Sequence, residues 1–288
     1  MEAFVHQLLS GLATGGIYAS VALSLVMIYQ ATHLVNFAQG EMAMFSTYVA
    51  WTLIEMGFPY WSAFFLVLAI SFAAGVLLER VVIRPAAGKS DLVVVVVFIG
   101  LLLIFNSLAG WMWTHTLKTF PSPFDGLPGS KYLTSHEIGA AIITLTELAL
   151  LYVFFRHTSL GLAMRAAAYN PESSRLLGVR VDLMLALGWG FAAAIGAVAG
   201  MMIAHVVYLD PNMMMGILLY GFAGALLGGI DNPVGAVIGG FIVGVMENIL
   251  GAYVIGTDLK LTVALVVIVA VLTVRPSGLF GKSIVTRV

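Results

Sequence analysis

Long stretches of this chain carry no charged residue, and their lengths set the first expectation about its architecture. Uncharged runs occupy residues 3–40, 56–78, 92–117, 183–209, 211–230 and 261–274. A helix needs about 20 mostly apolar residues to cross a bilayer. Three shorter or interrupted apolar stretches, 36–54, 138–155 and 234–254, each contain one glutamate. The pattern therefore predicts transmembrane helices along most of the chain.

The runs and the polar segments between them predict about eight or nine spans. Nine crossings fit at about 6–29, 36–54, 60–78, 92–113, 138–155, 183–207, 214–230, 234–254 and 257–274. No change of composition marks a second domain, and 114–137 is the one long loop that the pattern leaves outside the membrane. The expected fold class is an all-α, polytopic transmembrane helical bundle that forms a single domain over 1–288.

The composition narrows the possible functions. Of the 288 residues, 61% are hydrophobic and 9% are charged, against about 25% charged in a soluble domain. So few charges cannot cover the surface of a soluble fold, so most of the chain is expected to lie in a lipid membrane. This composition excludes a soluble enzyme and a disordered protein. The net charge of −1 gives no basic surface for a nucleic acid. Since there is no cysteine, disulfides and thiolate metal sites are excluded, and no cofactor is expected.

Lysine and arginine predict the orientation, because short cytoplasmic loops are enriched in them. With nine crossings, one side holds ten cations in the 79–91 loop, the 156–182 loop and the carboxyl tail, and the other side holds three: Lys118, Lys131 and Lys260. The amino terminus is then outside and the carboxyl terminus inside. The first apolar run has no basic residue before it and no clear cleavage site, so it is expected to remain as a span.

Two GKS tripeptides, at 88–90 and 281–283, do not predict a nucleotide site. A phosphate-binding loop needs a glycine five positions before the glycine of the GK pair, and those positions hold Ile83 and Pro276. Both tripeptides are interpreted as basic ends of spans. The chain is therefore not expected to bind ATP or to act as an enzyme.

Three glutamates fall within apolar spans: Glu41, Glu147 and Glu247. Ionisable groups inside a membrane are costly, and they mark either a substrate or proton path or a hydrogen-bonded packing site. Packing is favoured for Glu147, which has Thr144 and Thr146 nearby, and for Glu247, which is followed by Asn248. Glu41 is the better candidate for a path, because it ends the polar string that begins at Asn36.

Glycine is frequent, with 31 residues, and small-xxx-small pairs recur in the spans. The pairs are Gly11 with Gly15, Gly196 with Gly200, Gly224 with Gly228, Gly235 with Gly239, and Gly240 with Gly244. In lipid such pairs let helix backbones approach closely. Tight packing within the bundle is the favoured interpretation, with a dimer contact as the alternative.

The 156–182 loop predicts a helix that the connection itself does not require. Asn170 is a suitable N-cap, Pro171 suits the first helical position, and Gly178 suits the stop. This predicts a short helix at 171–177, preceded by an extension of the fifth span through Arg165–Ala168. Such an element is either a solvated capped turn or a docking surface for a cytoplasmic partner.

Three segments resemble a known family. HLVNFAQGEMAMFSTYVAW (33–51), GLAMRAAAYNPESSRLLGV (161–179) and GALLGGIDNPVGAVIGGFIVGVMENI (224–249) are similar to the LivH-type permease subunits of branched-chain amino acid ABC importers, and the resemblance extends over essentially the whole chain. Residues 166–178 also resemble, loosely, the EAA loop of importers: Ala167, Ala168 and Gly178 match, although no glutamate precedes the alanines.

The resemblance implies a permease subunit of a bacterial inner membrane. Its implied partners are a second, LivM-like permease, two cytoplasmic ATPase subunits, a periplasmic substrate-binding protein and a small-molecule substrate. Substrates would be branched-chain amino acids, or urea, amides or small carboxylates, which relatives carry. Two other readings stay open: a proton-coupled secondary carrier, with Glu41 or Glu247 as the coupling group, and a passive channel or structural subunit.

Two sets of residues are expected to carry the function of such a permease. The ATPase-coupling set comprises Ala167, Ala168, Asn170, Pro171, Glu172, Arg175, Leu176, Leu177 and Gly178. The translocation path is expected near Asn36, Gln39 and Glu41 and near the Gly-rich break 228–233, with candidates Asp231, Asn232, Glu247 and Asn248. Short segments interrupted by Gly or Pro in two halves of a transporter often meet at a midplane site.

Overall fold

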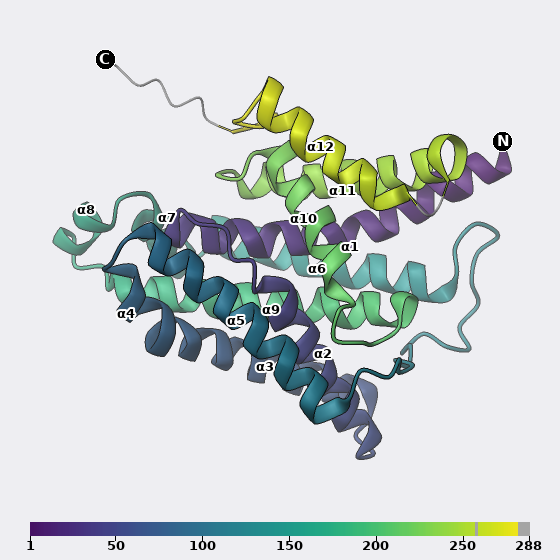
Figure 1. The fold of residues 1–288 in the computed structure, drawn as a ribbon, viewed down its shortest axis with the longest axis horizontal. Coiled ribbons are helices and arrows are strands. Elements are labelled where there is room, and N and C mark those ends of the chain that lie inside the picture. Colours follow the sequence, from purple (N-terminus) through teal and green to yellow (C-terminus); the bar gives the residue numbers. More distant parts are fainter. Residues whose placement is uncertain (257–258, 282–288) are drawn as a thin grey trace.

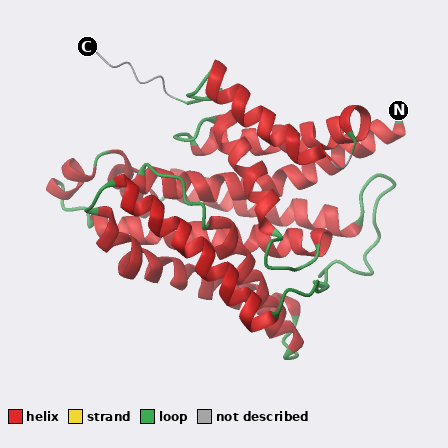
Figure 2. Ribbon diagram, in the orientation of Figure 1, coloured by secondary structure: helices red, strands yellow, loops and turns green. Residues whose placement is uncertain are grey.

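The computed structural model describes residues 1–256 and 259–281, which fold into a bundle of helices (Figures 1 and 2). The elements are α1 (Glu2–Thr32), α2 (Gln39–Glu55), α3 (Tyr60–Leu78), the π-helical η1 (Glu79–Ile83), α4 (Arg84–Ala87), α5 (Asp91–Trp113), α6 (Ser135–His157), α7 (Ser159–Tyr169), α8 (Pro171–Leu176), α9 (Val181–Val207), α10 (Met214–Gly228), α11 (Pro233–Leu250), the π-helical η2 (Gly251–Ile255) and α12 (Lys260–Val274). Among the described residues, extended pairing is confined to one antiparallel bridge between Lys118 and Leu209.

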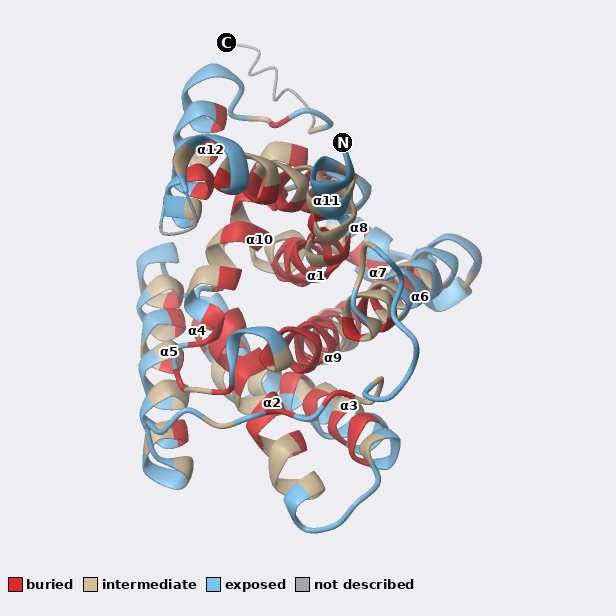
Figure 3. Ribbon diagram, turned by 90° about the vertical axis from the view of Figure 1, so that its right-hand side faces the viewer, coloured by how far each residue is buried: buried red, intermediate tan, exposed pale blue. Residues whose placement is uncertain are grey.

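The first helix forms the centre of the bundle. α1 packs against α6, α9, α10 and α11, and 89% of its most apolar 18-residue window is buried, against 17% for α6. Figure 3 shows buried residues concentrated on α1 and α9, while α5, α6 and α12 expose much of their surface. Exposed leucines, valines and phenylalanines on the outer helices are suited to contact with lipid.

Glycines allow the central helices to approach one another closely. A Cβ added at Gly11 would lie 2.9 Å from Val245 Cα, and one at Gly224 would lie 2.7 Å from Gly240 Cα. All five predicted small-xxx-small pairs lie at contacts within the chain, on the α1–α11, α2–α9 and α10–α11 interfaces. The prediction of tight packing inside the bundle is confirmed for these pairs, and contacts within the chain account for their small size.

The predicted spans correspond to helices, but not all of them are long enough to cross a membrane unaided. Within the described part of the chain, six helices combine the required length and apolarity: Glu2–Thr32, Tyr60–Ala87, Asp91–Trp113, Ser135–His157, Val181–Val207 and Pro233–Ile255. α2, α10 and α12 have 17, 15 and 15 residues, or about 22–26 Å at 1.5 Å per residue. An all-helical membrane bundle is therefore present, with six full-length apolar helices and three shorter ones.

Two expectations about the loops are wrong. Most of 79–91 is helical, because η1 and α4 continue α3 as far as Ala87. Two nitrogens of Arg84 donate to Glu79, at 2.7 and 3.1 Å. Arg165–Ala168 is not a continuation of the fifth span. Instead, α6 ends at His157, and the Thr158 hydroxyl, 2.9 Å from Gly161 N, caps the new helix α7.

The short helix after α7 forms as predicted, one residue shorter. α8 covers Pro171–Leu176, the Asn170 side chain accepts a hydrogen bond from Ser173 N, and Gly178 has a φ of +82°. α7 and α8 lie together at one end of the bundle (Figure 1), where the C-terminus of α6 also lies. The capping residues therefore explain the local structure, independently of any partner.

Gly224 offers a test of the α10–α11 contact. Gly224→Ala places a methyl group against the Gly240 backbone, so we expect a loss of stability of about 1–3 kcal/mol, the usual cost of overpacking. Gly216→Ala in the same helix is the matched control, since no heavy atom lies within 4 Å of its added Cβ. Thermal unfolding in detergent measures both variants. Equal melting temperatures would contradict the close approach of these two helices.

Candidate functional site

The first predicted path segment lies at a helix start inside the bundle. Asn36, Gln39 and Glu41 are all buried, with relative exposures of 0%, 1% and 7%. After α1 ends, residues 33–38 return towards the interior, and the Gln39 amide donates to Ala192 O, near the middle of α9, at 2.8 Å. α2 therefore begins between other helices rather than at the end of the bundle.

Glu41 belongs to a polar cluster that joins three parts of the chain. Asn106 Nδ2, from α5, lies 3.4 Å from Glu41 Oε2, 2.9 Å from Pro211 O and 3.2 Å from Asn212 Oδ1. Asp210 accepts from Asn212 N at 2.8 Å. Asn106 is half-buried and Asn212 is exposed, so this cluster, the α2–α10 cluster, is accessible from one side of the chain.

A second helix starts beside the first. A Cβ added at Gly40, in the first turn of α2, would contact Met214 and Leu218 in the first turns of α10 at 3.3–3.5 Å. Neither helix start carries a side-chain cap, although Gln39 N donates to Asn36 O and Met215 N donates to Asn212 O. The positive ends of two helix dipoles therefore lie next to each other. The cluster thus combines two helix N-termini with carboxylates and amides, and buried Gln39 Oε1 is an acceptor with no hydrogen-bond partner among the described residues.

The second predicted path segment, the break at 228–233, has its printed contacts elsewhere in the bundle. The break at 228–233 is a tight turn at the ends of α10 and α11: Gly229 has a φ of +111°, and the Asn232 side chain caps α11 by accepting from Gly235 N. Asp231 O accepts from Gln30, at the end of α1, and Asn232 Nδ2 donates to Phe280 O. The interior break instead precedes α10, at 208–213.

The residues missed by sequence reasoning have only weak signals. The Asp210-Pro211-Asn212 triplet is a turn signal between two uncharged runs, and Asn106 is an isolated amide in a long apolar helix. Neither feature identifies its partner. The tertiary fold alone brings Asn106, Glu41 and Asn212 together, because they are separated by 65 and 106 positions in the chain.

Glu247 and Asn248 form a third, separate cluster at the other end of α11. Tyr18 donates to Glu247 Oε2 at 2.8 Å, and Lys260 Nζ lies 3.3 Å from Glu247 Oε1 and 3.0 Å from Asn248 Oδ1. Asn248 Nδ2 also lies 3.4 Å from Thr14 Oγ1. Lys260, which was counted from the sequence among the three cations of the outer side, therefore reaches a buried carboxylate. This network ties α12 to α1 and α11.

Glu147 has a different partner from the one expected. Ser20, on α1, donates to Glu147 Oε2 at 3.0 Å, whereas the Thr144 hydroxyl donates to the backbone of its own helix. The glutamate is thus a hydrogen-bonded link between α6 and α1. Among the described residues, no group of three or more His, Asp or Glu side chains could hold a metal ion.

The predicted coupling residues divide into packed and exposed groups. Ala167 is fully buried in a cluster with Met164, Val181 and Met184, so it holds α7 against α9. Leu176 and Leu177 are 90% and 84% exposed. Pro171 and Gly178 bound α8, and Arg175 pairs with Asp182 at the start of α9 at 3.0 Å. Two leucines thus project from a short, well-anchored helix.

A lipid-exposed helical bundle, with interrupted helices around an internal polar cluster, defines a polytopic membrane permease. Residues 7–272 match the family model described as branched-chain amino acid transport system / permease component. The chain belongs to this family: it is a non-enzymatic permease subunit of an ABC transporter, in the inner membrane.

Two relatives agree with this assignment, and one solved structure has a similar fold. The chain is 31% identical to the high-affinity branched-chain amino acid transport system permease protein LivH of Salmonella typhimurium over 99% of this chain and 98% of that protein. It is 30% identical to BraD of Pseudomonas aeruginosa, with the same coverage. The fold is similar to a chain of PsaBC from Streptococcus pneumoniae in complex with Fab, with a TM-score of 0.52 and 12% identity over 93% of this chain and 91% of that one.

The Glu247 cluster is open to a double-mutant test. Lys260→Met removes the positive partner from a buried carboxylate, and we expect a loss of stability of about 1.5–3 kcal/mol, typical of hydrogen bonds to charged groups. Adding Glu247→Gln should recover much of that loss, because the unpaired charge is gone. Melting curves of the single and double variants measure the coupling, and additive effects would show that the two side chains do not interact.

Proposed function

We propose that this chain is the LivH-type permease of an ATP-driven importer that moves branched-chain or related hydrophobic amino acids by alternating access. The observation that carries the proposal is the α2–α10 cluster, where two helices begin beside each other inside the bundle. Discontinuous helices whose N-termini meet near the midplane are a recurring substrate site in transporters, because the positive dipole ends attract anionic groups.

The cluster suits both ends of an amino acid. The uncapped starts of α2 and α10 favour a carboxylate, while Glu41 and Asp210 favour an ammonium group. The surrounding residues are mostly apolar, including Met214 and Leu218, which suits an aliphatic side chain. Urea or a neutral amide could form hydrogen bonds with the side-chain amides of the cluster, but it has no charged group to pair with the helix dipoles or the carboxylates. The cluster therefore favours an amino acid over these alternatives.

The membrane crossing proposed here keeps nine spans. α2 and α10 are too short for a bilayer about 30 Å thick, and the non-helical segments 33–38 and 208–213 would supply the remaining length. Irregular backbone is tolerated at that depth only where protein or a water-filled cavity surrounds it. The exposed side of Asn212 would then face a LivM-like second permease, and the two chains together would enclose the path.

Coupling is proposed to act through α8. Two ATPase subunits would bind on the cytoplasmic side, and a periplasmic binding protein would deliver substrate to the outer side. ATP-driven closure of the ATPases would move α8, and because Arg175 is paired with Asp182, the movement would pass to α9. α9 holds Gln39 through Ala192, which links the coupling helix to the start of α2.

Uptake measurements on a Glu41 variant test the path. The complete transporter, purified with its ATPase and binding protein, should accumulate labelled leucine in liposomes only with ATP. Glu41→Gln removes a charge without changing shape, so we expect at least about tenfold weaker uptake at low substrate, the equivalent of about 1.4 kcal/mol. Glu55→Gln, an exposed acid on the same helix, is the matched control and should transport normally.

The results of these uptake measurements distinguish an error in the proposed path from an error in the proposed substrate or energy source. Wild-type kinetics in Glu41→Gln would remove this residue from the path while leaving the importer assignment intact. ATP-dependent uptake of urea or an amide in preference to leucine would instead overturn the proposed substrate. Uptake without ATP, driven by a proton gradient, would favour the secondary carrier.

Binding of the ATPase tests α8. Burial of Leu176 and Leu177 in a cleft of the ATPase would contribute roughly 3–6 kcal/mol, at about 1.5–3 kcal/mol for each side chain. The double variant Leu176→Asp, Leu177→Asp should therefore release the ATPase from purified membranes, whereas Arg175→Ala should change binding little. If the double variant remains folded and keeps both the ATPase and ATP hydrolysis, coupling must occur elsewhere.

A further inference from the structure

A pocket lies between α1, α6, α7, α9 and α11, away from the α2–α10 cluster. Its volume is about 350 Å³, within the range of about 300–1,000 Å³ for sites that hold organic molecules. The deeper walls are buried apolar side chains: Leu23, Met27, Leu151, Met164 and Met184. Neither the proposed path nor the proposed ATPase contact uses this pocket. Of the predicted coupling residues, Ala168 is among those that line it.

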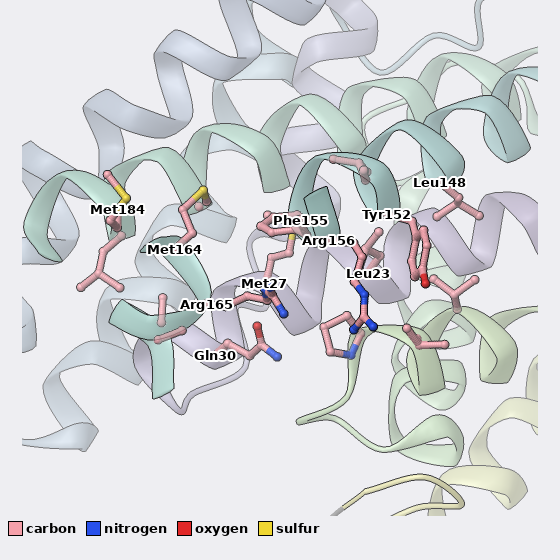
Figure 4. A pocket seen from close by; sticks show the side chains of 18 residues that line it. Leu23, Met27, Gln30, Leu148, Tyr152, Phe155, Arg156, Met164, Arg165 and Met184 are labelled. Atoms are coloured by element: carbon pink, nitrogen blue, oxygen red, sulfur yellow. The ribbon is translucent and has the colours of Figure 1, made fainter. Parts of the chain in front are cut away.

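Positive charge is the polar feature of this pocket. Figure 4 shows Arg156 and Arg165 among the side chains that line it, together with Gln30. No acidic side chain is among its described lining residues. Neither arginine takes part in the ion pairs of the described part of the chain. Two unpaired guanidinium groups therefore accompany an apolar cavity.

We propose that this pocket binds an anionic phospholipid, with its phosphate on Arg156 and Arg165 and part of an acyl chain against the apolar walls. Guanidinium groups are suited to phosphate, since their planar donors can form two parallel hydrogen bonds. Basic pockets between transmembrane helices on the cytoplasmic side bind lipid head groups in this way. The leaflet follows from the proposed orientation, in which 156–182 is cytoplasmic.

The position of the pocket favours a lipid over a partner protein. α6 forms one wall, and it is among the most exposed of the long apolar helices. Tyr152, on the same wall, is 55% exposed. An aromatic ring next to two arginines is typical of a membrane interface. The lipid would hold α6 and α7 to α1 and α11, near the helix that is proposed to couple ATP hydrolysis to transport.

Lipid binding to the assembled transporter tests the role of the two arginines. The purified complex is stripped of lipid, titrated with phosphatidylglycerol or phosphatidylcholine in detergent, and bound lipid is counted by native mass spectrometry. We expect at least a fivefold preference for phosphatidylglycerol, which Arg156→Gln, Arg165→Gln should abolish. The control Arg80→Gln, Arg180→Gln changes the net charge equally, at exposed arginines outside the pocket, and should keep the preference.

The cavity is tested separately, with both arginines intact. A Cβ at Gly188 meets only Met164 Cε, at 4.0 Å, so Gly188→Leu fills the pocket without displacing backbone. It should lower phosphatidylglycerol binding at least fivefold. Inorganic phosphate should not compete at equal concentration; effective competition would indicate an ion site and overturn the proposal. Normal lipid binding in Gly188→Leu, or in the double arginine variant, would also overturn it.

A photocrosslinker identifies the occupant directly. Benzoylphenylalanine in place of Tyr152, in the complete transporter in native membranes, should form an adduct with the mass of a phospholipid. A cross-link to the second permease or to an ATPase would show that protein covers the pocket, and would overturn the proposal. Neither result bears on Glu41, so failure here is distinguishable from failure of the proposed function.

Discussion

Lipid cannot form hydrogen bonds with a peptide backbone, and this constraint decides where the helices of this chain can be interrupted. The glycines of α1, α10 and α11 bring these helices into backbone contact. Because α9 also packs on α1, a protein interior exists in which two helices can begin. The starts of α2 and α10 are possible only there, where Ala192 O and Asn106 accept or donate the hydrogen bonds that lipid cannot supply.

The same constraint separates the buried polar groups by role. Glu147 and Glu247 are on unbroken helices, and their contacts, with Ser20 and with Tyr18 and Lys260, join neighbouring helices. Glu41 is on the first turn of a helix that begins inside the protein, next to a second such helix. Three glutamates that look alike in the sequence therefore have different surroundings, and only Glu41 lies where two helices begin next to each other.

Two contacts link α8, α9 and α2. Arg175 of α8 forms an exposed ion pair with Asp182 of α9, and Ala192 O of α9 accepts a hydrogen bond from Gln39 at the start of α2. The pocket with Arg156 and Arg165 adjoins the same region, because α7 and α9 contribute to its walls. The same end of the bundle thus combines two exposed leucines with a pocket that is lined by two arginines.

The class of fold, the approximate bounds of the long helices, the tight packing at the glycine pairs and the capped helix α8 were predictable, because hydrophobic length, residue size and capping are local properties of a sequence. Asn36, Gln39 and Glu41 were also recognisable as a polar segment. Their neighbours in space were not predictable: the fold places Asn106 and Asn212 next to Glu41, whereas Asp231 and Asn232 contact Gln30 and Phe280. Which helix interruptions come into contact depends on how the helices pack in three dimensions. A run of apolar residues predicts a helix, but it does not identify the neighbouring helix.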